Sequence, residues 1–342
     1  MAHPRHVLLG PQAQSGALPV CDHYSGDPPR MRKSLQLQAA LMAEMGRCVM
    51  DVTLDSEDGA AAGSEAQQAQ TVADLLQEFA VSATKPQALA PRIGVRVHAL
   101  DHPHFADDVR TIVGAAAERL AYVMLPKVES LAQVEQALLH IDAAARGLLL
   151  PLHVLIESPA AVQQVFAIAA HPRVESLSFG LMDFVSAHNG AIPAQAMGLR
   201  SAGDNHSLDQ FHHPLVVRAK LDIASACHAH GKVPSHCVVT ELRDGAAIEA
   251  AARTAAQALG YTRMWSIHPE QIRPILRGFS PPVSEVEQAS DIILAAQRQH
   301  WAPLSIEGKL HDRASYRYFW QVLERAYRTG VALPAPVHHL FV

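Results

Sequence analysis

Eight short apolar runs constrain the fold of this chain more than any other feature of its sequence. They cover residues 17–24, 48–57, 92–98, 121–126, 152–158, 174–180, 232–239 and 263–268. Between most of them lie helix-like stretches, such as residues 31–46, 130–146 and 246–260, with apolar residues at helical spacing. Near-continuous apolar strands that alternate with helices indicate a parallel sheet covered by helices. Eight such units predict an α/β fold of the TIM (β/α)8 barrel type.

The rival arrangement is a doubly wound sheet, but neither GxGxxG nor GxxxxGK[ST] follows the first run. After residue 278 the alternation stops. A capped helix, an extended or turn segment at 302–312 and an amphipathic helix over 313–330 follow. We therefore predict a barrel domain over residues 1–278 and an appended C-terminal region over 279–342. A Gly-, Asn- and His-rich insert at 187–214 is expected to be a loop at one barrel face.

Composition excludes several classes of function. The 342 residues carry a net charge of −5, which gives no electrostatic reason to bind nucleic acid or an anionic membrane. No apolar run approaches the roughly 20 residues of a membrane span, and the first residues lack the apolar core of a signal peptide. The four cysteines form no CxxC pair and are expected to be reduced thiols of a cytoplasmic protein.

Polar side chains stand at the ends of all eight apolar runs. In a (β/α)8 barrel the carboxyl ends of the strands meet at one face, and that face carries the active site. The residues concerned are Asp22, His23, Tyr24, Asp55, Glu57, Asp58, Arg96, His98, Lys127, Glu129, Glu157, Asp183, His236 and His268. Their convergence indicates a polar pocket at this face.

Two carboxylates in this set, Glu157 and Asp183, follow neighbouring strands. Left unpaired, they would repel each other and raise one pKa. A divalent cation removes that cost, and oxygen ligands favour Mg²⁺ or Mn²⁺. The alternative is that each carboxylate pairs with Arg96 or Lys127.

The basic residues of the set also have two interpretations each. Arg96 can hold a substrate carboxylate through two parallel hydrogen bonds, or form an internal ion pair with Asp55 or Glu57. Lys127 can form a Schiff base, but its place after a proline favours pairing with a carboxylate. At least one residue of the acidic group formed by Asp55, Glu57 and Asp58 is expected to face the pocket.

Six motifs together resemble the citrate lyase beta-subunit-like family, which includes malyl-CoA, citramalyl-CoA and citryl lyases within the HpcH/HpaI aldolase superfamily. They are LDSEDGA (54–60), RVH (96–98), LPKVES (125–130), LIES (155–158), FGLMDF (179–184) and SIHPEQI (266–272). The resemblance spans about residues 48–328. The usual form of the second motif in that family is RVN.

The resemblance implies a TIM barrel with Mg²⁺, or alternatively Mn²⁺, held by Glu157 and Asp183. It implies that Arg96 contacts the oxo-acid part of the substrate and that the acidic motif through Asp58 supports the metal and its waters. GKLHD resembles a family segment that would place Asp312 on a C-terminal helical lid reaching a neighbouring subunit. Asp312 would then serve as an acid or base in a homotrimer or hexamer.

The substrate half of the site departs from the family pattern at the first strand. Family members open with RSxLFVPG, whereas this chain has ALPVCDHYSG, with His23 and Tyr24 near the VPG position. We expect His23, Tyr24, Glu57 and Lys127, together with Arg96, to contact the substrate.

The implied function is a Mg²⁺-dependent carbon–carbon lyase, an oxo-acid lyase. It would cleave a malyl-, citramalyl- or citryl-CoA-like thioester, or a related hydroxy acid, into an oxo acid and an acyl product. The alternatives are a free-acid class II pyruvate aldolase and a non-catalytic paralogue that binds a carboxylate. The expected partners are the small-molecule hydroxy acid or its CoA thioester and further copies of the chain, with no nucleic acid and no membrane.

Overall fold

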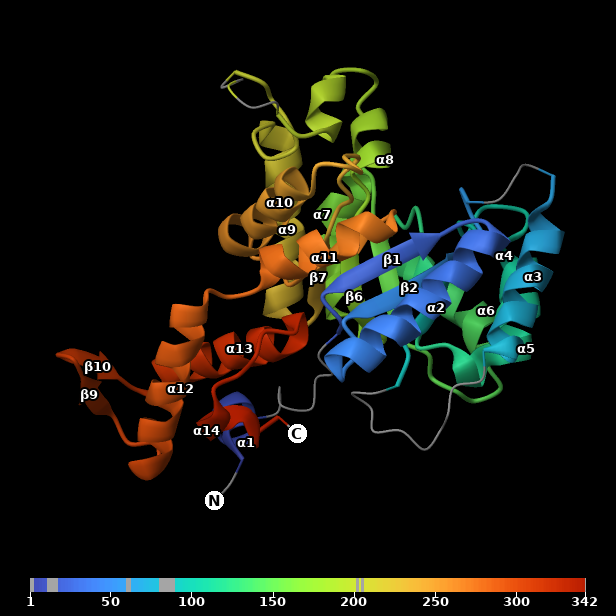
Figure 1. Ribbon diagram of the computed structural model, residues 1–342. Helices are drawn as coiled ribbons and strands as arrows, with labels where there is room; N and C mark the ends of the chain where they lie inside the picture. Colours follow the sequence, from blue (N-terminus) through green and yellow to red (C-terminus); the bar gives the residue numbers. More distant parts are fainter. Residues whose placement is uncertain are drawn as a thin grey trace. The chain divides into compact units, whose positions relative to one another are not determined.

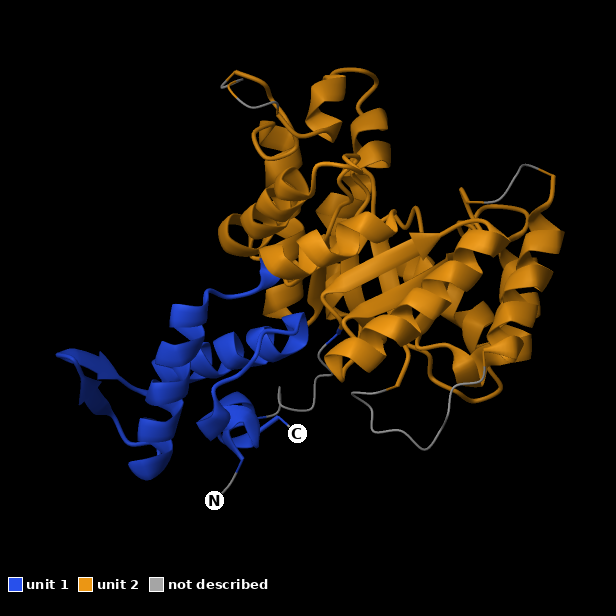
Figure 2. Ribbon diagram, in the orientation of Figure 1, with its two compact units in different colours: residues 1–18, 279–342 blue, residues 19–278 orange. Residues whose placement is uncertain are grey.

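The computed structural model describes residues 3–10, 18–59, 63–79, 90–200, 203 and 206–341. The chain forms two compact units, residues 19–278 and residues 1–18 together with 279–342 (Figure 2). Residues 1–18, which the sequence analysis assigned to the barrel domain, thus group with the C-terminal residues.

The larger unit is a closed barrel of eight parallel strands in chain order, and β1 pairs with β8 to close it (Figure 1). The strands are β1 (Cys21–Ser25), β2 (Met50–Asp55), β3 (Ile93–Arg96), β4 (Tyr122–Leu125), β5 (Leu152–Ile156), β6 (Val174–Phe179), β7 (Val233–His236) and β8 (Arg263–Ser266). Seven of them fall within the predicted runs, and β1 extends one residue beyond its run, to Ser25. The predicted TIM (β/α)8 barrel is confirmed.

Helices follow the strands around the barrel. They are α2 (Pro28–Met45), α3 (Glu65–Glu78), α4 (Phe105–Asp108), α5 (Gly114–Ala116), α6 (Leu131–Ala144), α7 (Pro159–Ala170), α8 (Leu181–Ser186), α9 (Pro214–Ala229), α10 (Gly245–Leu259) and α11 (Pro269–Phe279). A π-helical turn, Val109–Val113, separates α4 from α5. The sequence analysis did not single out α8, α9 or α11. The last of these contains Pro274, a residue that normally marks a helix end.

An apolar layer fills the middle of the barrel. Side chains alternate between the two faces of a strand, and the inward residues Tyr24, Tyr122, Met124, Leu155 and Trp265 pack together. Gly94 on β3 makes room for this layer, because a Cβ there would lie 2.1 Å from the Tyr122 ring.

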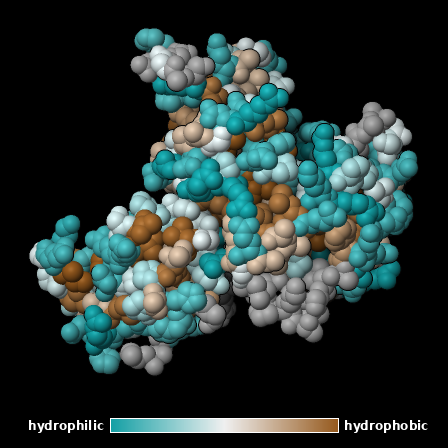
Figure 3. Space-filling model, viewed as in Figure 1, coloured by the Kyte–Doolittle hydropathy of each residue, from teal (hydrophilic) through white to brown (hydrophobic). Residues whose placement is uncertain are grey.

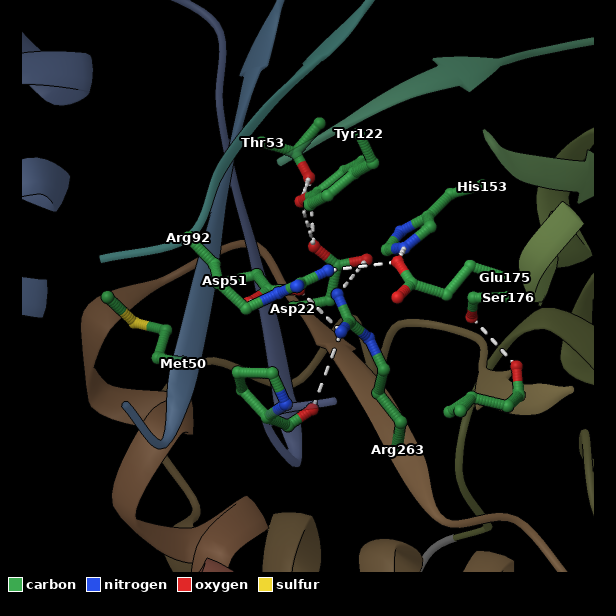
Figure 4. A network of polar contacts seen from close by, with 12 residues as sticks. Asp22, Met50, Asp51, Thr53, Arg92, Tyr122, His153, Glu175, Ser176 and Arg263 are labelled. Carbon is green, nitrogen blue, oxygen red and sulfur yellow. Dashed lines mark hydrogen bonds and ion pairs between the residues drawn. The ribbon is translucent and has the colours of Figure 1, made fainter. Parts of the chain in front are cut away.

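Below that layer, at the amino ends of the strands, lies a buried network of charges (Figure 4). Arg263 lies 3.0 Å from Asp22 and 2.6 Å from Asp51, and all three side chains are fully buried. Arg92 joins Asp51 to Glu175 at 3.2 and 2.9 Å. The network joins residues from opposite sides of the barrel and so connects their strands. Removing one member of a buried ion pair would leave an uncompensated charge.

The second unit contains α1 (Pro4–Leu9), α12 (Val283–Arg298), the hairpin of β9 (Leu304–Ile306) and β10 (Lys309–His311), α13 (Arg313–Thr329) and α14 (Ala335–His338). The hairpin turns through Glu307 and Gly308, both at positive φ, as a two-residue turn requires. α13 packs its buried face, including Trp320 and Leu323, onto α12 and α1. The predicted C-terminal helices are present.

None of the helices in the described residues is long and apolar enough to cross a bilayer. On the face seen in Figure 3, hydrophilic side chains cover much of each unit, and smaller apolar areas lie among these hydrophilic side chains.

Candidate active site

Arg96 and Asp55 form the centre of the site at the carboxyl ends of β3 and β2, where they are partners in the strand register. Arg96 donates Nε–H to Asp55 Oδ1 at 2.8 Å and Nη2–H to Asp55 Oδ2 at 2.6 Å. Its Nη1 lies 2.7 Å from Glu57 Oε2. Burial opposes the charge of Arg96, but Asp55 and Glu57 outweigh burial and raise its pKa above the ordinary value.

These contacts orient the Arg96 guanidinium but do not use all of its N–H donors. A guanidinium has five N–H donors, and the two hydrogen bonds to Asp55 use the Nε–H and one Nη2–H. The second Nη2–H makes no hydrogen bond with the described residues, and with Nη1, which forms ion pairs with Glu57 and Asp58, it matches a planar carboxylate. The two alternatives drawn from the sequence are therefore compatible, because the internal ion pair sets the guanidinium for a further anion.

Lys127 extends the cluster from the loop after β4. Its Nζ lies 2.6 Å from Glu57 Oε1 and 3.8 Å from Asp58 Oδ1. Partial burial acts to lower the pKa of Lys127, but its hydrogen bond to Glu57 and the nearby carboxylates raise it. A charged lysine paired in this way is not a Schiff-base nucleophile, since that role requires the neutral amine.

Two glycines let the carboxylates approach. A Cβ on Gly59 would lie 2.8 Å from Asp55 Oδ2, and one on Gly180 would lie 2.4 Å from Glu157 Cγ. The glycines of the DG and FG dipeptides thus clear the space that Asp55 and Glu157 occupy. The sequence analysis quoted both dipeptides within motifs but gave neither glycine a role.

Glu157 and Asp183 line one pocket of about 310 Å³, with Lys127 on its rim. Glu157 stands between the end of β5 and Ser158, whose Oγ accepts the Ala161 N–H and starts α7. Asp183 lies in the first turn of α8 and is exposed. Glu157 is only 5% exposed, and burial, followed by the charges of Asp183 and Glu57, raises its pKa to about 8.

This pair fits the predicted cation. A buried carboxylate with a raised pKa beside other carboxylates lacks positive charge, which a divalent cation supplies. Among the described residues no group of three or more His, Cys, Asp or Glu side chains forms a complete metal site. Mg²⁺ is usually bound by one or two carboxylates, with water and substrate completing the shell. Glu157 and Asp183 match that pattern.

A second pocket, of about 390 Å³, also has Lys127 on its wall. Glu57 and Asp58 line it from the acidic loop, and His98 lines it from the end of β3. His98 was among the strand-end residues in the sequence but received no role there.

Three further residues that the sequence analysis assigned to the site are not in the linings of these two pockets. Tyr24 faces the barrel interior, with its ring 5.5 Å from the Arg96 guanidinium. His23 alternates to the opposite face of β1, where its Nδ1 contacts Ser266 Oγ at 2.9 Å. Burial lowers the pKa of His23 to about 4, so this ring is neutral near pH 7. Asp312 belongs to the second unit and caps α13, accepting the N–H groups of Ala314 and Ser315.

Comparison with known proteins assigns the family. The sequence profile described as HpcH/HpaI aldolase/citrate lyase matches residues 35–269. The chain is 28% identical over 322 residues to L-malyl-CoA/beta-methylmalyl-CoA lyase of Cereibacter sphaeroides, covering 87% of this chain and 96% of that protein.

Solved structures agree with this assignment. A citrate lyase from Burkholderia xenovorans LB400 is 47% identical, with a TM-score of 0.78 and full coverage of both chains. The CitE protein of Mycobacterium tuberculosis, solved with magnesium, acetoacetate and coenzyme A, is 22% identical, covers 91% of this chain and 98% of that one, and has a TM-score of 0.66. At that identity it shares the fold.

Proposed function

We propose that this chain, a carbon–carbon lyase that belongs to the HpcH/HpaI aldolase/citrate lyase family, uses Mg²⁺ to cleave a 3-hydroxyacyl-CoA. The products are a 2-oxo acid and an acyl-CoA, so the substrate class is malyl-, citramalyl- or citryl-CoA-like. The observation that carries the proposal is the pocket in which Glu157 and Asp183 lie beside Lys127, next to the oriented Arg96.

Each residue has a part that follows from its contacts. Arg96 binds the carboxylate of the oxo-acid half through its remaining N–H groups and stabilises negative charge there. Asp55 and Glu57 hold the guanidinium in place. Lys127 keeps the Glu57 carboxylate paired and adds positive charge between the two pockets. The layer of Tyr24 and Trp265 closes the barrel beneath the site and excludes water from below.

The residues that would hold Mg²⁺ are Glu157 and Asp183, with Mn²⁺ as the alternative ion. The bound ion supplies Lewis-acid polarisation of the substrate oxygen that becomes the new carbonyl. Support comes from the raised pKa of Glu157 and from the magnesium in the CitE structure. Asp58, 62% exposed and 3.6 Å from Arg96 Nη1, is placed to support water in the site.

Coenzyme A binding and assembly complete the proposal. The Cereibacter relative is named for malyl-CoA and beta-methylmalyl-CoA, and CitE was solved with coenzyme A. We include a homotrimer or hexamer in which Asp312 of one subunit serves the site of another. Two roles of Asp312 would then coexist, because it is also the N-cap of α13.

The test is a cleavage assay with trapping of the released oxo acid. Purified protein is mixed with malyl-, citramalyl- and citryl-CoA, the matching free acids and 4-hydroxy-2-oxo acids, with Mg²⁺ or with EDTA. Glu157→Gln should lose the EDTA-sensitive cleavage. Glu129→Gln is the matched control, because Glu129 lines the same pocket and is exposed.

Each outcome assigns the protein to one class. Cleavage of one thioester only with Mg²⁺ supports the proposal and names the substrate. Cleavage of free acids alone moves the protein to the class II pyruvate aldolases. No cleavage of any compound, with an oxo acid still bound, leaves a carboxylate-binding paralogue and refutes the proposal.

A further inference from the structure

His98 and Asp108 form a rigid pair beside the site. His98 follows β3, and Asp108 is the last residue of α4. Asp108 Oδ2 accepts the backbone N–H of His98 at 2.9 Å and lies 2.6 Å from Nδ1 of the same residue. The Asp108 side chain is 1% exposed. One buried carboxylate therefore fixes both the backbone and the ring of His98.

This arrangement determines which ring nitrogen is available. A carboxylate oxygen that already accepts a backbone N–H also accepts the ring proton, so Nδ1 carries the hydrogen and Nε2 keeps its lone pair. The His102 ring stacks on the His98 ring at 4.2 Å with an interplanar angle of 11°. Asp108 thus restrains the His98 ring within its plane, and the stacked His102 ring restrains it from one face.

The free edge of the ring reaches the second pocket. His98 lines that pocket, whereas Asp108, which holds the Nδ1 edge, does not. The edge that contributes to the pocket wall is therefore the one that carries Nε2. Lys127 lies on the walls of both this pocket and the pocket of Glu157 and Asp183. The pocket of the histidine and the pocket of the two carboxylates thus share Lys127 in their walls.

We propose that His98, in place of Asp312, is the catalytic residue that carries the proton of the lyase reaction, and that Asp108 is its positioning residue. The inference rests on the proposed function. Neutral His98 accepts the substrate hydroxyl proton at Nε2 as the carbon–carbon bond breaks. The hydroxyl oxygen becomes the carbonyl of the oxo acid, and the electron pair of the broken bond moves to the acyl half as an enolate. The Nε2–H then protonates the enolate carbon, which releases the acyl-CoA and restores neutral His98.

The surroundings of His98 suit both steps. Asp108 stabilises the imidazolium that exists between them, as a carboxylate does when it holds the far nitrogen of a catalytic histidine. Glu57, Asp58, Glu65 and Asp101 line the same pocket, together with Lys127 and His102. The His104 ring lies 5.9 Å from the His98 ring, centroid to centroid, and 4.0 Å from Glu65.

The experiment compares His98→Asn, Asp108→Asn and the double variant with wild type. His104→Asn is the matched control, because it removes a neighbouring imidazole but keeps the backbone carbonyl that accepts the Asp108 N–H at 2.9 Å. For each protein, kcat and KM are measured from pH 5.5 to 9.5 on the thioester that wild type cleaves. Thermal unfolding and circular dichroism report folding. Exchange of the acyl-CoA α-hydrogens in D2O with the oxo acid present isolates the enolate step.

The expected loss in kcat for His98→Asn is about 10² to 10⁴-fold, the range typical of a lost general acid–base group, with KM changed less than about threefold. The limb of the pH profile that reports protonation of the base disappears, and α-hydrogen exchange falls by a similar factor. Adding Asp108→Asn to His98→Asn costs no more activity, because residues that act as a unit are not additive. His104→Asn keeps wild-type kcat within about threefold.

Two results overturn the inference, and they differ in whether the proposed function survives. If wild type cleaves a thioester and folded His98→Asn retains its kcat and α-hydrogen exchange, His98 is not the proton carrier although the lyase function holds. If wild type cleaves no thioester, the proposed function fails and the role of His98 fails with it. Should His98→Asn not fold, His98→Gln takes its place with the same expected losses.

Discussion

Glu157→Gln tests the electrostatic account of the site through folding stability, without any substrate. Glu157 is 5% exposed, and burial together with Asp183 and Glu57 raises its pKa from 4.5 to about 8 in the folded protein. In the unfolded chain the carboxyl has its ordinary value. Between these two pH values the folded state therefore holds a proton that the unfolded chain has lost.

The sign and size of the effect follow from linkage. Because the folded pKa lies above the unfolded one, the contribution of Glu157 to stability is fully present below pH 4.5 and is lost as the pH rises through 8. At about 1.4 kcal/mol per pH unit, the loss over the whole range is about 4 to 5 kcal/mol. Glutamine has no charge at any of these pH values, so the variant lacks this dependence.

The assay is urea unfolding in EDTA at intervals from pH 5 to 9. The free energy of unfolding of wild type minus that of Glu157→Gln should fall by about 4 kcal/mol as the pH rises across this range. Mg²⁺ added at pH 8 should stabilise wild type and leave Glu157→Gln unchanged, since an ion that binds only the folded state shifts the equilibrium toward it. Glu129→Gln should follow wild type. A wild-type minus Glu157→Gln difference that does not vary with pH would refute the reasoning.

Three further changes test other parts of the structure. Gly180→Ala places a Cβ 2.4 Å from Glu157 Cγ and should weaken Mg²⁺ binding by about tenfold or more in calorimetric titration, because disturbing the groups that hold a metal ligand in place typically costs that much. Unaltered affinity would contradict the packing argument. Arg263→Met removes the ion-pair partner of buried Asp22 and leaves buried Asp51 with Arg92 alone. It should lower the free energy of unfolding by about 3 to 5 kcal/mol in urea, and a loss below about 1 kcal/mol would contradict this reasoning. Asp312→Ala should lower the free energy of unfolding by about 1 kcal/mol, because it removes a helix cap. Asp312→Ser keeps the cap. If Asp312→Ser also keeps full cleavage activity, the acid–base role of Asp312 is wrong.

The sequence alone determined the architecture and the identity of the charged residues at the strand ends. Eight apolar runs alternating with helices suffice for a (β/α)8 barrel, because buried parallel strands and their covering helices leave periodic patterns that a linear chain displays. The same order of strands places Arg96, Glu157 and Asp183 at one face, because parallel strands carry their carboxyl ends together.

Tertiary structure decided what those residues contact, since side-chain partners depend on register and strand alternation between segments far apart in the chain. His23 and Tyr24 are adjacent in sequence, yet only Tyr24 lies by Arg96, because neighbouring side chains on a strand point to opposite faces. The ion pairs of Arg263 with Asp22 and Asp51 join segments more than 200 residues apart, and no local sequence pattern predicts them. His98 shows the same limit: its residue type was visible in the sequence, but the buried carboxylate that orients its ring comes from a separate helix that only the folded chain brings against it.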